Sequence, residues 1–271
     1  MLTLARAKMV AGGAGDPIPT VFTQLGEEGI HFRRGQFTLI SAAPGVGKSL
    51  FSLRLALSAN VPTFYVSADT DAATTYMRAA SMLTGETTYE VERKIEARNT
   101  REIDIRMGML KHLRFSFESP IFLNDFEEDM HMYGHVYGRW PELVVVDNIR
   151  NMEGDDGDAA NQDARSCDYL HDFAHKTGAS VVGLHHVVGA YDDGTTPVPQ
   201  SGLINKISKV PEMILTLYRS EDVGTTGHGA LFVCPVKNRT GKADPSGNWS
   251  IPLRYEPARM SLNDWNPNGR L

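Results

Sequence analysis

The residue pattern with the clearest chemistry is the run Ala-Ala-Pro-Gly-Val-Gly-Lys-Ser at residues 42–49. It fits the phosphate-binding motif Gly-x-x-x-x-Gly-Lys-Ser/Thr, with Ala42 in place of the first glycine. In such a loop, successive backbone N–H groups surround the phosphates at a helix N-terminus, whose dipole favours anions. The run therefore predicts a loop that binds ATP or another nucleoside triphosphate with Mg²⁺. The predicted nucleotide contacts are Ala43, Pro44, Gly45, Val46, Gly47, Lys48 and Ser49.

Two of these side chains and one distant carboxylate have predicted roles in catalysis and metal binding. Lys48 is predicted to reach the β- and γ-phosphates, and the Ser49 hydroxyl is predicted to hold Mg²⁺. Asp147 ends the run Leu-Val-Val-Val-Asp, which is typical of the Walker B strand, whose terminal acid orders the Mg²⁺ shell. Ser49 and Asp147 are therefore the predicted metal ligands.

Asp69 and His186 each follow a further apolar run. Asp69 is a candidate general base for the attacking water, but Asp69 and Asp71 both precede a helical segment and are suited to cap it. His186 is a candidate sensor of the γ-phosphate that also stabilises the transition state. Two alternatives to this role stay open. In the first, His185 and His186 are ordinary residues at the end of a strand. In the second, they bind a metal ion together with Asp69 and Asp147.

Basic residues late in the chain suit contacts with phosphates outside the chain's own loop. Lys237 and Arg239 end a predicted strand and are either surface charges or fingers that reach the γ-phosphate bound by a neighbouring subunit. Lys206 and Lys209 follow a long loop and are either solvated or bind the phosphates of a DNA strand. The acidic loop at 150–163 opposes direct phosphate contact, so the DNA prediction rests on the two lysines.

Alternating strand and helix patterns position these residues. The β-branched runs predict buried parallel strands, the segments between them have helical composition, and the later strands are separated by turns. This pattern predicts an α/β fold with a mainly parallel, twisted sheet flanked by helices and with antiparallel strands at its C-terminal edge. The predicted strands are 36–41, 62–67, 121–123, 142–147, 180–184, 212–218, 230–236 and 248–255, and the predicted helices are 48–59, 71–83, one or two within 86–112, 126–138 and 161–176.

The bulk composition narrows the function classes. The chain has 271 residues, 41% of them hydrophobic, and a formal net charge of −6. The acidic balance argues against a protein that coats duplex DNA, so any DNA contact must come from local basic loops. Cys167 and Cys234 lie far apart and indicate neither a disulfide framework nor a zinc site. We expect a cytoplasmic protein with no membrane partner.

The order of these motifs resembles the RecA-like ATPase domain of the DnaB-type hexameric replicative helicases (superfamily 4). The similarity runs from about residue 17 to 264, and we expect the family's N-terminal domain to be absent. Asp69 stands where the family has its catalytic Glu, and His186 stands where it has a Gln sensor. The matching segments are 18–20, 34–36, the loop at 42–49, 66–69, 144–148, 181–186, 201–219 and 236–241.

The resemblance implies a RecA-like P-loop NTPase core and divides the chain into a flexible N-terminal arm (1–16), the ATPase domain (17–264) and a C-terminal tail (265–271). It implies an ATP-dependent DNA helicase or translocase of phage or bacterial origin. Such a protein acts on single-stranded DNA as a hexameric ring, hydrolyses NTP at subunit interfaces and meets replication or recombination proteins. A RecA-like recombination mediator, a regulatory DNA-dependent ATPase without unwinding, and a metal-dependent DNA nuclease remain alternatives.

Overall fold

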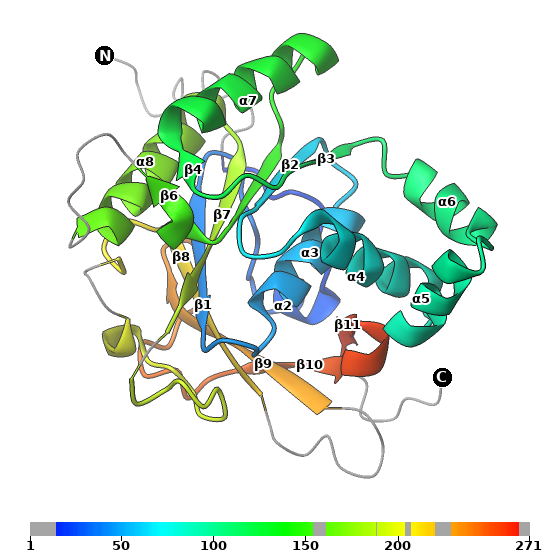
Figure 1. The fold of residues 1–271 in the computed structure, drawn as a ribbon. Coiled ribbons are helices and arrows are strands. Elements are labelled where there is room, and N and C mark those ends of the chain that lie inside the picture. Colours follow the sequence, from blue (N-terminus) through cyan, green and yellow to red (C-terminus); the bar gives the residue numbers. More distant parts are fainter. Residues whose placement is uncertain (1–14, 154–160, 188, 204–206, 220–228, 266–271) are drawn as a thin grey trace.

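A nine-stranded sheet forms the centre of the computed structural model, which describes residues 15–153, 161–187, 189–203, 207–219 and 229–265. The strand order is β11-β10-β9-β8-β1-β7-β5-β2-β3. The strands from β8 to β3 are parallel, and β9, β10 and β11 continue the sheet antiparallel (Figure 1). The predicted fold class is therefore confirmed. The strands are β1 (Phe37–Ala42), β2 (Thr63–Ser67), β3 (Leu113–Ser116), β5 (Leu143–Asp147), β7 (Ser180–His186), β8 (Met213–Arg219), β9 (Gly229–Asn238), β10 (Ile251–Glu256) and β11 (Ser261–Asp264).

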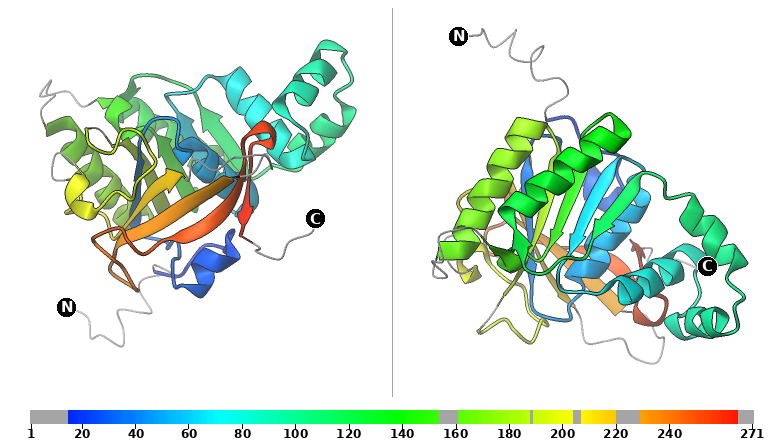
Figure 2. Two further views of the ribbon diagram at one scale, coloured as in Figure 1. Left: turned by 90° about the horizontal axis from the view of Figure 1, so that it is seen from below. Right: turned by 45° about the horizontal axis from the view of Figure 1, so that its top comes forward.

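Helices cover both faces of this sheet (Figure 2). Side chains of α2, α3 and α4 belong to the apolar cluster on one face, and those of α7 and α8 belong to the cluster on the other. Helices α5 and α6 extend sideways from α4, which they contact through Ala80, Val91 and Ile103. The helices are α2 (Thr23–Glu27), α3 (Lys48–Ser58), α4 (Ala72–Thr84), α5 (Thr88–Glu96), α6 (Arg101–Gly108), α7 (Leu123–Tyr137) and α8 (Gln162–Thr177).

Apolar side chains of the central strands fill both clusters. Every residue of β1, β2 and β5 is buried, as expected for parallel strands that are covered on both faces. On one face, Phe51 of α3 stacks on Phe22 with ring centroids 4.8 Å apart. On the other face, Phe126 of α7 meets Phe173 of α8 edge-on at 5.3 Å. This packing on both faces fixes the positions of the central strands, and therefore also of the residues at the strand ends.

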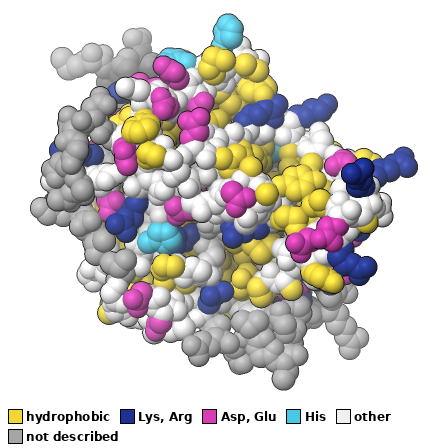
Figure 3. All heavy atoms as spheres, viewed as in Figure 1, with side chains coloured by type: hydrophobic (Ala, Val, Ile, Leu, Met, Phe, Trp, Pro, Cys, Tyr) yellow, Lys and Arg dark blue, Asp and Glu magenta, His cyan; other side chains and the backbone are white. Residues whose placement is uncertain are grey.

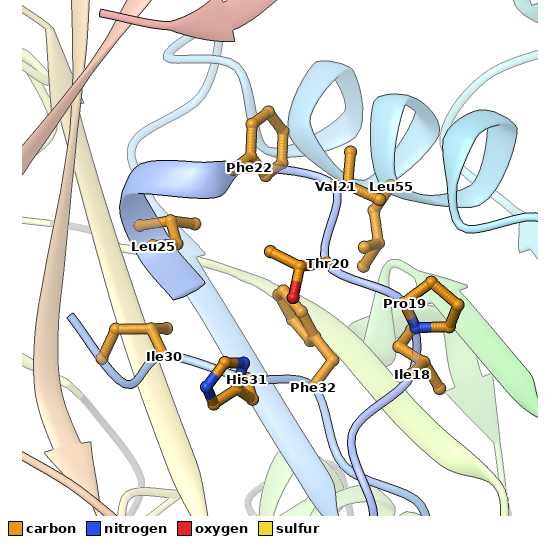
Figure 4. A pocket seen from close by; sticks show the side chains of 10 residues that line it. All are labelled: Ile18, Pro19, Thr20, Val21, Phe22, Leu25, Ile30, His31, Phe32 and Leu55. Atoms are coloured by element: carbon orange, nitrogen blue, oxygen red, sulfur yellow. The ribbon is translucent and has the colours of Figure 1, made fainter. Parts of the chain in front are cut away.

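The segment before β1 packs against α3 and leaves one small pocket (Figure 4). Among its lining residues only His31 is titratable, and burial, with a smaller contribution from Arg33, lowers the pKa of this histidine. A pocket without convergent charged groups is a poor candidate for a catalytic site. The lining consists of Ile18, Pro19, Thr20, Val21, Phe22, Leu25, Ile30, His31, Phe32 and Leu55.

The structure differs from the sequence prediction mainly at the edges of the sheet. The charged region 86–112 forms helices α5 and α6, as expected. Strands β3 and β11 were not predicted, because each has four residues and one buried side chain, Leu113 or Leu262. Short edge strands lack the apolar run that marks a central strand. The strand predicted at 121–123 is the two-residue β4 (Ile121–Phe122), which pairs with β6 (Met152–Glu153) outside the main sheet.

The face of the molecule that Figure 3 shows is mixed in character. On the face shown in Figure 3, acidic and basic side chains are interspersed with apolar ones. None of the described helices combines the length and apolar character that crossing a bilayer requires.

Replacement of Gly183 by alanine tests the tight packing of β7. A Cβ at this position would lie 2.7 Å from Ile149 Cγ2 and 3.0 Å from Phe37 Cε2, so neighbouring side chains must shift. We expect Gly183→Ala to lower the free energy of unfolding by about 1–3 kcal/mol, measured by urea titration. Gly134→Ala is the control, because a Cβ inside α7 at Gly134 meets nothing within 4 Å. It should be neutral or stabilise by up to about 1 kcal/mol, and an equal loss in both variants would contradict the packing argument.

Candidate nucleotide site

The carboxyl ends of four parallel strands meet at one edge of the sheet. The loop at 43–47 follows β1, and Asp69 comes two residues after β2, while Asp147 and His186 end β5 and β7. The strand register pairs Ala42 with His186 and Ser67 with Asp147. Ligands of open α/β sheets bind outside such strand ends. The predicted cluster of Lys48, Asp69, Asp147 and His186 is therefore assembled at this edge.

The loop between β1 and α3 has the backbone that a bound phosphate requires. Gly45 and Gly47 have φ angles of 75° and 128°, which L side chains rarely adopt. No described side chain caps the N-terminus of α3, so its first N–H groups remain available to an anion. The loop therefore fits the phosphates of a nucleotide.

A glycine in the loop after β7 packs closely against the phosphate loop. Gly194 has a φ of 70°, and a Cβ there would lie 2.3 Å from Val46 Cγ2. Its carbonyl accepts a hydrogen bond from the backbone N–H of Arg219 at 2.8 Å. Only glycine permits this close approach, so Gly194 is a supporting residue that the sequence did not reveal.

Lys48 is the central cation of the site. The side chain is buried, with 5% of the residue's surface exposed, and Nζ donates to the carbonyls of Ala42 and Ala43 at 2.9 and 3.1 Å. Nζ also lies 3.0 Å from His186 Nδ1. An ammonium group only donates hydrogen bonds, so Nδ1 must accept and the ring proton lies on Nε2. That atom faces Asp69 Oδ2 at 3.3 Å, which completes a Lys48–His186–Asp69 chain.

Burial makes the ammonium group of Lys48 more acidic. Desolvation lowers the pKa of Lys48 to about 8, although the carboxylates of Asp147 and Asp69 oppose this shift. In a buried cluster the charged ammonium is therefore maintained by its acidic neighbours.

Asp147 and Ser49 have the chemistry of a Mg²⁺ site. Burial raises the pKa of Asp147, and hydrogen bonds from Ser49 and Tyr65 act against this rise. Tyr65 Oη lies 3.2 Å from Asp147 Oδ2 and 2.8 Å from Ser52 Oγ. A carboxylate beside a hydroxyl supplies the hard oxygen ligands that Mg²⁺ prefers. These two residues thus fit the ion, and Tyr65 is a contact that sequence reasoning missed.

Asp69 faces the site instead of capping the next helix. Asp71 caps α4, since its Oδ1 accepts from the backbone N–H of Thr74 at 2.9 Å. Asp69 Oδ2 instead accepts from Asn148 Nδ2 at 3.2 Å, in addition to the contact with His186. The hydrogen bond from His186, followed by that from Asn148, lowers the pKa of Asp69. The capping alternative for Asp69 is therefore wrong, and its carboxylate is ionised at neutral pH.

The two adjacent histidines have different surroundings. His185 is buried, with 1% of its surface exposed, and its Nε2 lies 3.2 Å from Asp163 Oδ2. Successive residues of a strand point to opposite faces, which separates His185 from His186. Within the described part of the chain, these histidines do not converge with Asp69 and Asp147 as a set of three metal ligands. The alternative in which the two histidines bind a metal ion with Asp69 and Asp147 therefore has no geometric support among the described residues.

Lys237 and Arg239 lie at the opposite edge of the sheet. Strand β9 is antiparallel to β8, and Asn238 pairs with Met213 at the start of β8. Lys237 Nζ donates to the carbonyls of Ser208 and Lys209, both at 2.8 Å. Neither finger candidate is therefore brought to the phosphate loop of its own chain.

Arg239 and Lys209 lie beside each other at that edge. Arg239 Nη1 donates to Glu212 Oε1 at 3.1 Å, and Nη2 donates to the carbonyl of Lys209 at 3.4 Å. The loop after β7 crosses the sheet to the start of β8, so Lys209 lies at the edge opposite Asp147. Lys206, the acidic segment 154–160 and most of the N-terminal arm are outside the described residues.

Comparison with known proteins gives one family and several relatives. Residues 27–188 match the family model described as an AAA domain. The chain is 42% identical to the Gene 65 protein of Mycobacterium phage L5 over 273 residues, covering 98% of this chain and 99% of the relative. It is also 42% identical to the Gene 65 protein of Mycobacterium phage D29 over 235 residues, covering 84% of this chain and 98% of the relative.

Solved structures show the same fold at low sequence identity. One of them, described as an ATPase domain, has a TM-score of 0.79 and 16% identity, covering 97% of this chain and 96% of its own. A DnaB-like replicative helicase, described with its interactions with primase, has a TM-score of 0.75 and 15% identity, covering 98% of this chain and 67% of its own. The RecA-like fold expected from the motifs is thereby confirmed, and so is the resemblance to the DnaB-type ATPase domain.

The lowered pKa of Lys48 predicts a pH-dependent affinity for nucleotides. Because this pKa is about 8 in the nucleotide-free protein, Lys48 loses its charge as the pH rises above that value. We expect the Kd for a fluorescent ADP analogue to rise by up to about tenfold per pH unit above the pKa. Lys48→Arg is the control, because guanidinium stays charged throughout this range. Circular dichroism should confirm folding at each pH, and a flat wild-type profile would contradict the burial argument.

Proposed function

We propose, given that this chain belongs to the AAA domain family, that it is an ATP-dependent DNA helicase or translocase that acts on single-stranded DNA as a ring. Residues 17–264 form its ATPase domain in this proposal, and NTP is hydrolysed at the interfaces between subunits. The similar solved structures support this proposal, since one is an ATPase domain and the other a DnaB-like replicative helicase. The relatives from Mycobacterium phages L5 and D29 support the expected phage origin.

The observation that carries the proposal is the separation of the two groups of basic residues. Lys48 lies at the carboxyl edge of the parallel strands, whereas Lys237 and Arg239 lie at the amino edge of β8. A head-to-tail ring brings unlike surfaces of identical subunits together. In such a ring Arg239 of one subunit faces the γ-phosphate held by the loop of the next, as arginine fingers do when supplied in trans.

Each of the site residues of one chain would have a separate role in NTP hydrolysis. Mg²⁺ held by Ser49 and Asp147 would neutralise charge on the β- and γ-phosphates. Lys48 would turn from His186 to the phosphates, since its ammonium forms a stronger pair with them than with a neutral imidazole. Asp69 would orient the attacking water and accept its proton.

In this proposal His186 links the movement of Lys48 to the action of Asp69 on the attacking water. With Lys48 moved to the phosphates, His186 Nδ1 becomes free to accept from another donor, while Nε2 still faces Asp69. His186 would thus report the presence of the γ-phosphate to the carboxylate that handles the water.

A recombination mediator or regulatory ATPase would use the same nucleotide residues without unwinding DNA. A strand-displacement assay on a forked duplex separates these functions, together with mass measurement in the presence of an ATP analogue and single-stranded DNA. The proposal requires a ring, expected to be a hexamer, and ATP-dependent displacement. A ring that hydrolyses ATP on DNA without displacing the strand would favour the mediator, and degradation of an oligonucleotide without ATP would favour the nuclease.

Lys48→Ala tests the phosphate loop. Removal of the only ammonium group that the described residues place in this loop should reduce the ATPase rate by roughly 100-fold or more. Lys111→Ala is the matched control, because Lys111 is exposed and lies before β3, away from the loop. Both variants should keep the wild-type circular dichroism spectrum. Full ATPase activity in Lys48→Ala would contradict the assignment of the loop.

Mixing experiments test whether Arg239 acts in trans. Arg239→Ala and Lys48→Ala should each be inactive alone, but mixed rings contain interfaces where an intact loop meets an intact Arg239. We expect partial recovery of ATPase activity in the mixture, measured against the ratio of the two variants. Arg101→Ala serves as the control, since Arg101 is an exposed residue at the start of α6 and should leave the wild-type rate unchanged.

One outcome of the mixing experiment would contradict a role of Arg239 in trans. If mass measurement confirms mixed rings and no ratio restores activity, Arg239 does not complete the site of a neighbour.

A further inference from the structure

Two histidines and a glutamate converge at the edge of the sheet opposite the phosphate loop. His171 and His175 are four residues apart on α8, which places them on one face of the helix. Glu212 comes directly before β8, and its carboxylate is buried beneath them. Within the described part of the chain, this is where three such side chains are close enough to share one metal ion.

The three nearest donor atoms have the spacing of metal ligands. His171 Nε2 lies 3.1 Å from His175 Nε2 and 3.0 Å from Glu212 Oε1, and His175 Nε2 lies 3.9 Å from the same oxygen. Ligands of a tetrahedral zinc ion with bonds of about 2.0–2.1 Å are about 3.3 Å apart. The point equidistant from the three atoms lies in their plane, about 2.0 Å from each, so a tetrahedral ion requires His175 Nε2 and Glu212 Oε1 to approach each other by about 0.6 Å. The exposed side chain of His175 can make this adjustment while the backbone stays in place.

Neighbouring groups hold two of these ligands in the required orientation. Glu212 Oε2 accepts from the backbone N–H of Phe37 at 3.0 Å, which leaves Oε1 facing the histidines. His171 Nδ1 lies 3.5 Å from Asp172 Oδ1, which favours a proton on Nδ1 and a free lone pair on Nε2. Carboxylates and backbone groups orient metal-binding histidines in this way.

We propose that His171, His175 and Glu212 form a site for Zn²⁺ that is separate from the nucleotide site. The set of two histidines and one glutamate is a known type of zinc ligand set with an open fourth position. His175 has 56% of its side chain exposed, so the fourth position is accessible to water. Imidazole nitrogens favour Zn²⁺ over Mg²⁺, which prefers oxygen ligands.

Arg239 is the group that opposes metal binding. Its guanidinium donates to Glu212 Oε1 at 3.1 Å, but 51% of this side chain is exposed, which leaves room for it to move. A metal ion on Oε1 would weaken the pairing and release the guanidinium. If the proposed function holds, zinc therefore controls the position of the residue that serves the neighbouring site.

Metal binding is measured on the untagged, nucleotide-free full chain with excess Mg²⁺ present. Equilibrium dialysis against Zn²⁺ should give one bound ion per chain, and Co²⁺ should give the visible absorption of a low-coordinate site. His175→Ala, a change at an exposed position, should weaken Zn²⁺ binding by at least about tenfold, and Glu212→Gln should do the same. Circular dichroism and thermal melting should confirm that both variants fold.

His131 and His135 provide the matched control, because they have the same spacing on α7 but belong to no such group of ligands within the described residues. The double variant His131→Ala, His135→Ala should bind Zn²⁺ like the wild type. Arg239→Ala should bind Zn²⁺ more tightly, because a positive charge next to Oε1 is removed.

The proposal is overturned if the wild type binds no stoichiometric Zn²⁺, or if His175→Ala binds it as tightly as the wild type. Equal or weaker binding by Arg239→Ala would contradict the assignment of Glu212 Oε1 as a ligand. None of these measurements involves nucleotide or DNA, so their outcome is independent of the proposed function.

Discussion

The burial of one ammonium group, that of Lys48, is the constraint on which the rest of the site depends. A charged amine removed from water is strongly destabilised unless hydrogen bonds and opposite charges compensate. Here two backbone carbonyls, one imidazole and two carboxylates provide that compensation. One carbonyl belongs to the last residue of β1 and the other to the first residue of the loop, so the strand must stop where the loop begins. The site is thus organised around this cation.

The direction of the strands separates the chemistry of the molecule into two edges. Parallel strands bring Lys48, Asp69, Asp147 and His186 to one edge, because each of these residues lies at or shortly after the carboxyl end of a strand. The reversal between β8 and β9 brings Arg239 to the other edge, where Glu212 binds it. A head-to-tail assembly would explain why the nucleotide-site residues and Arg239 lie at opposite edges, since each subunit then presents a different edge to each of its two neighbours.

The backbone of the fold was largely predictable from the sequence. Apolar runs marked β1, β2, β5 and β7, since strands covered on both faces have few polar positions. The phosphate loop was evident from its glycines, which permit the backbone of the loop, and from its lysine, which supplies the positive charge. Strands β3 and β11 were not predictable in this way, as each is short and has only one buried residue. Glycines such as Gly194 were also not predictable, since their constraint comes from a distant segment that packs on them.

The sequence by itself determined the chemical groups, their order and the local structure that presents them, because these depend on residue type and on neighbours along the chain. Only the tertiary structure decided which groups pair. Lys48 and His186 are 138 residues apart, and His186 and Asp69 are 117 apart, yet each pair is in contact. The structure also assigned Asp71 to the helix cap and Asp69 to the site, and it placed two histidines beside Glu212. The order and direction of the strands set such contacts, and these arise from the packing of the whole sheet.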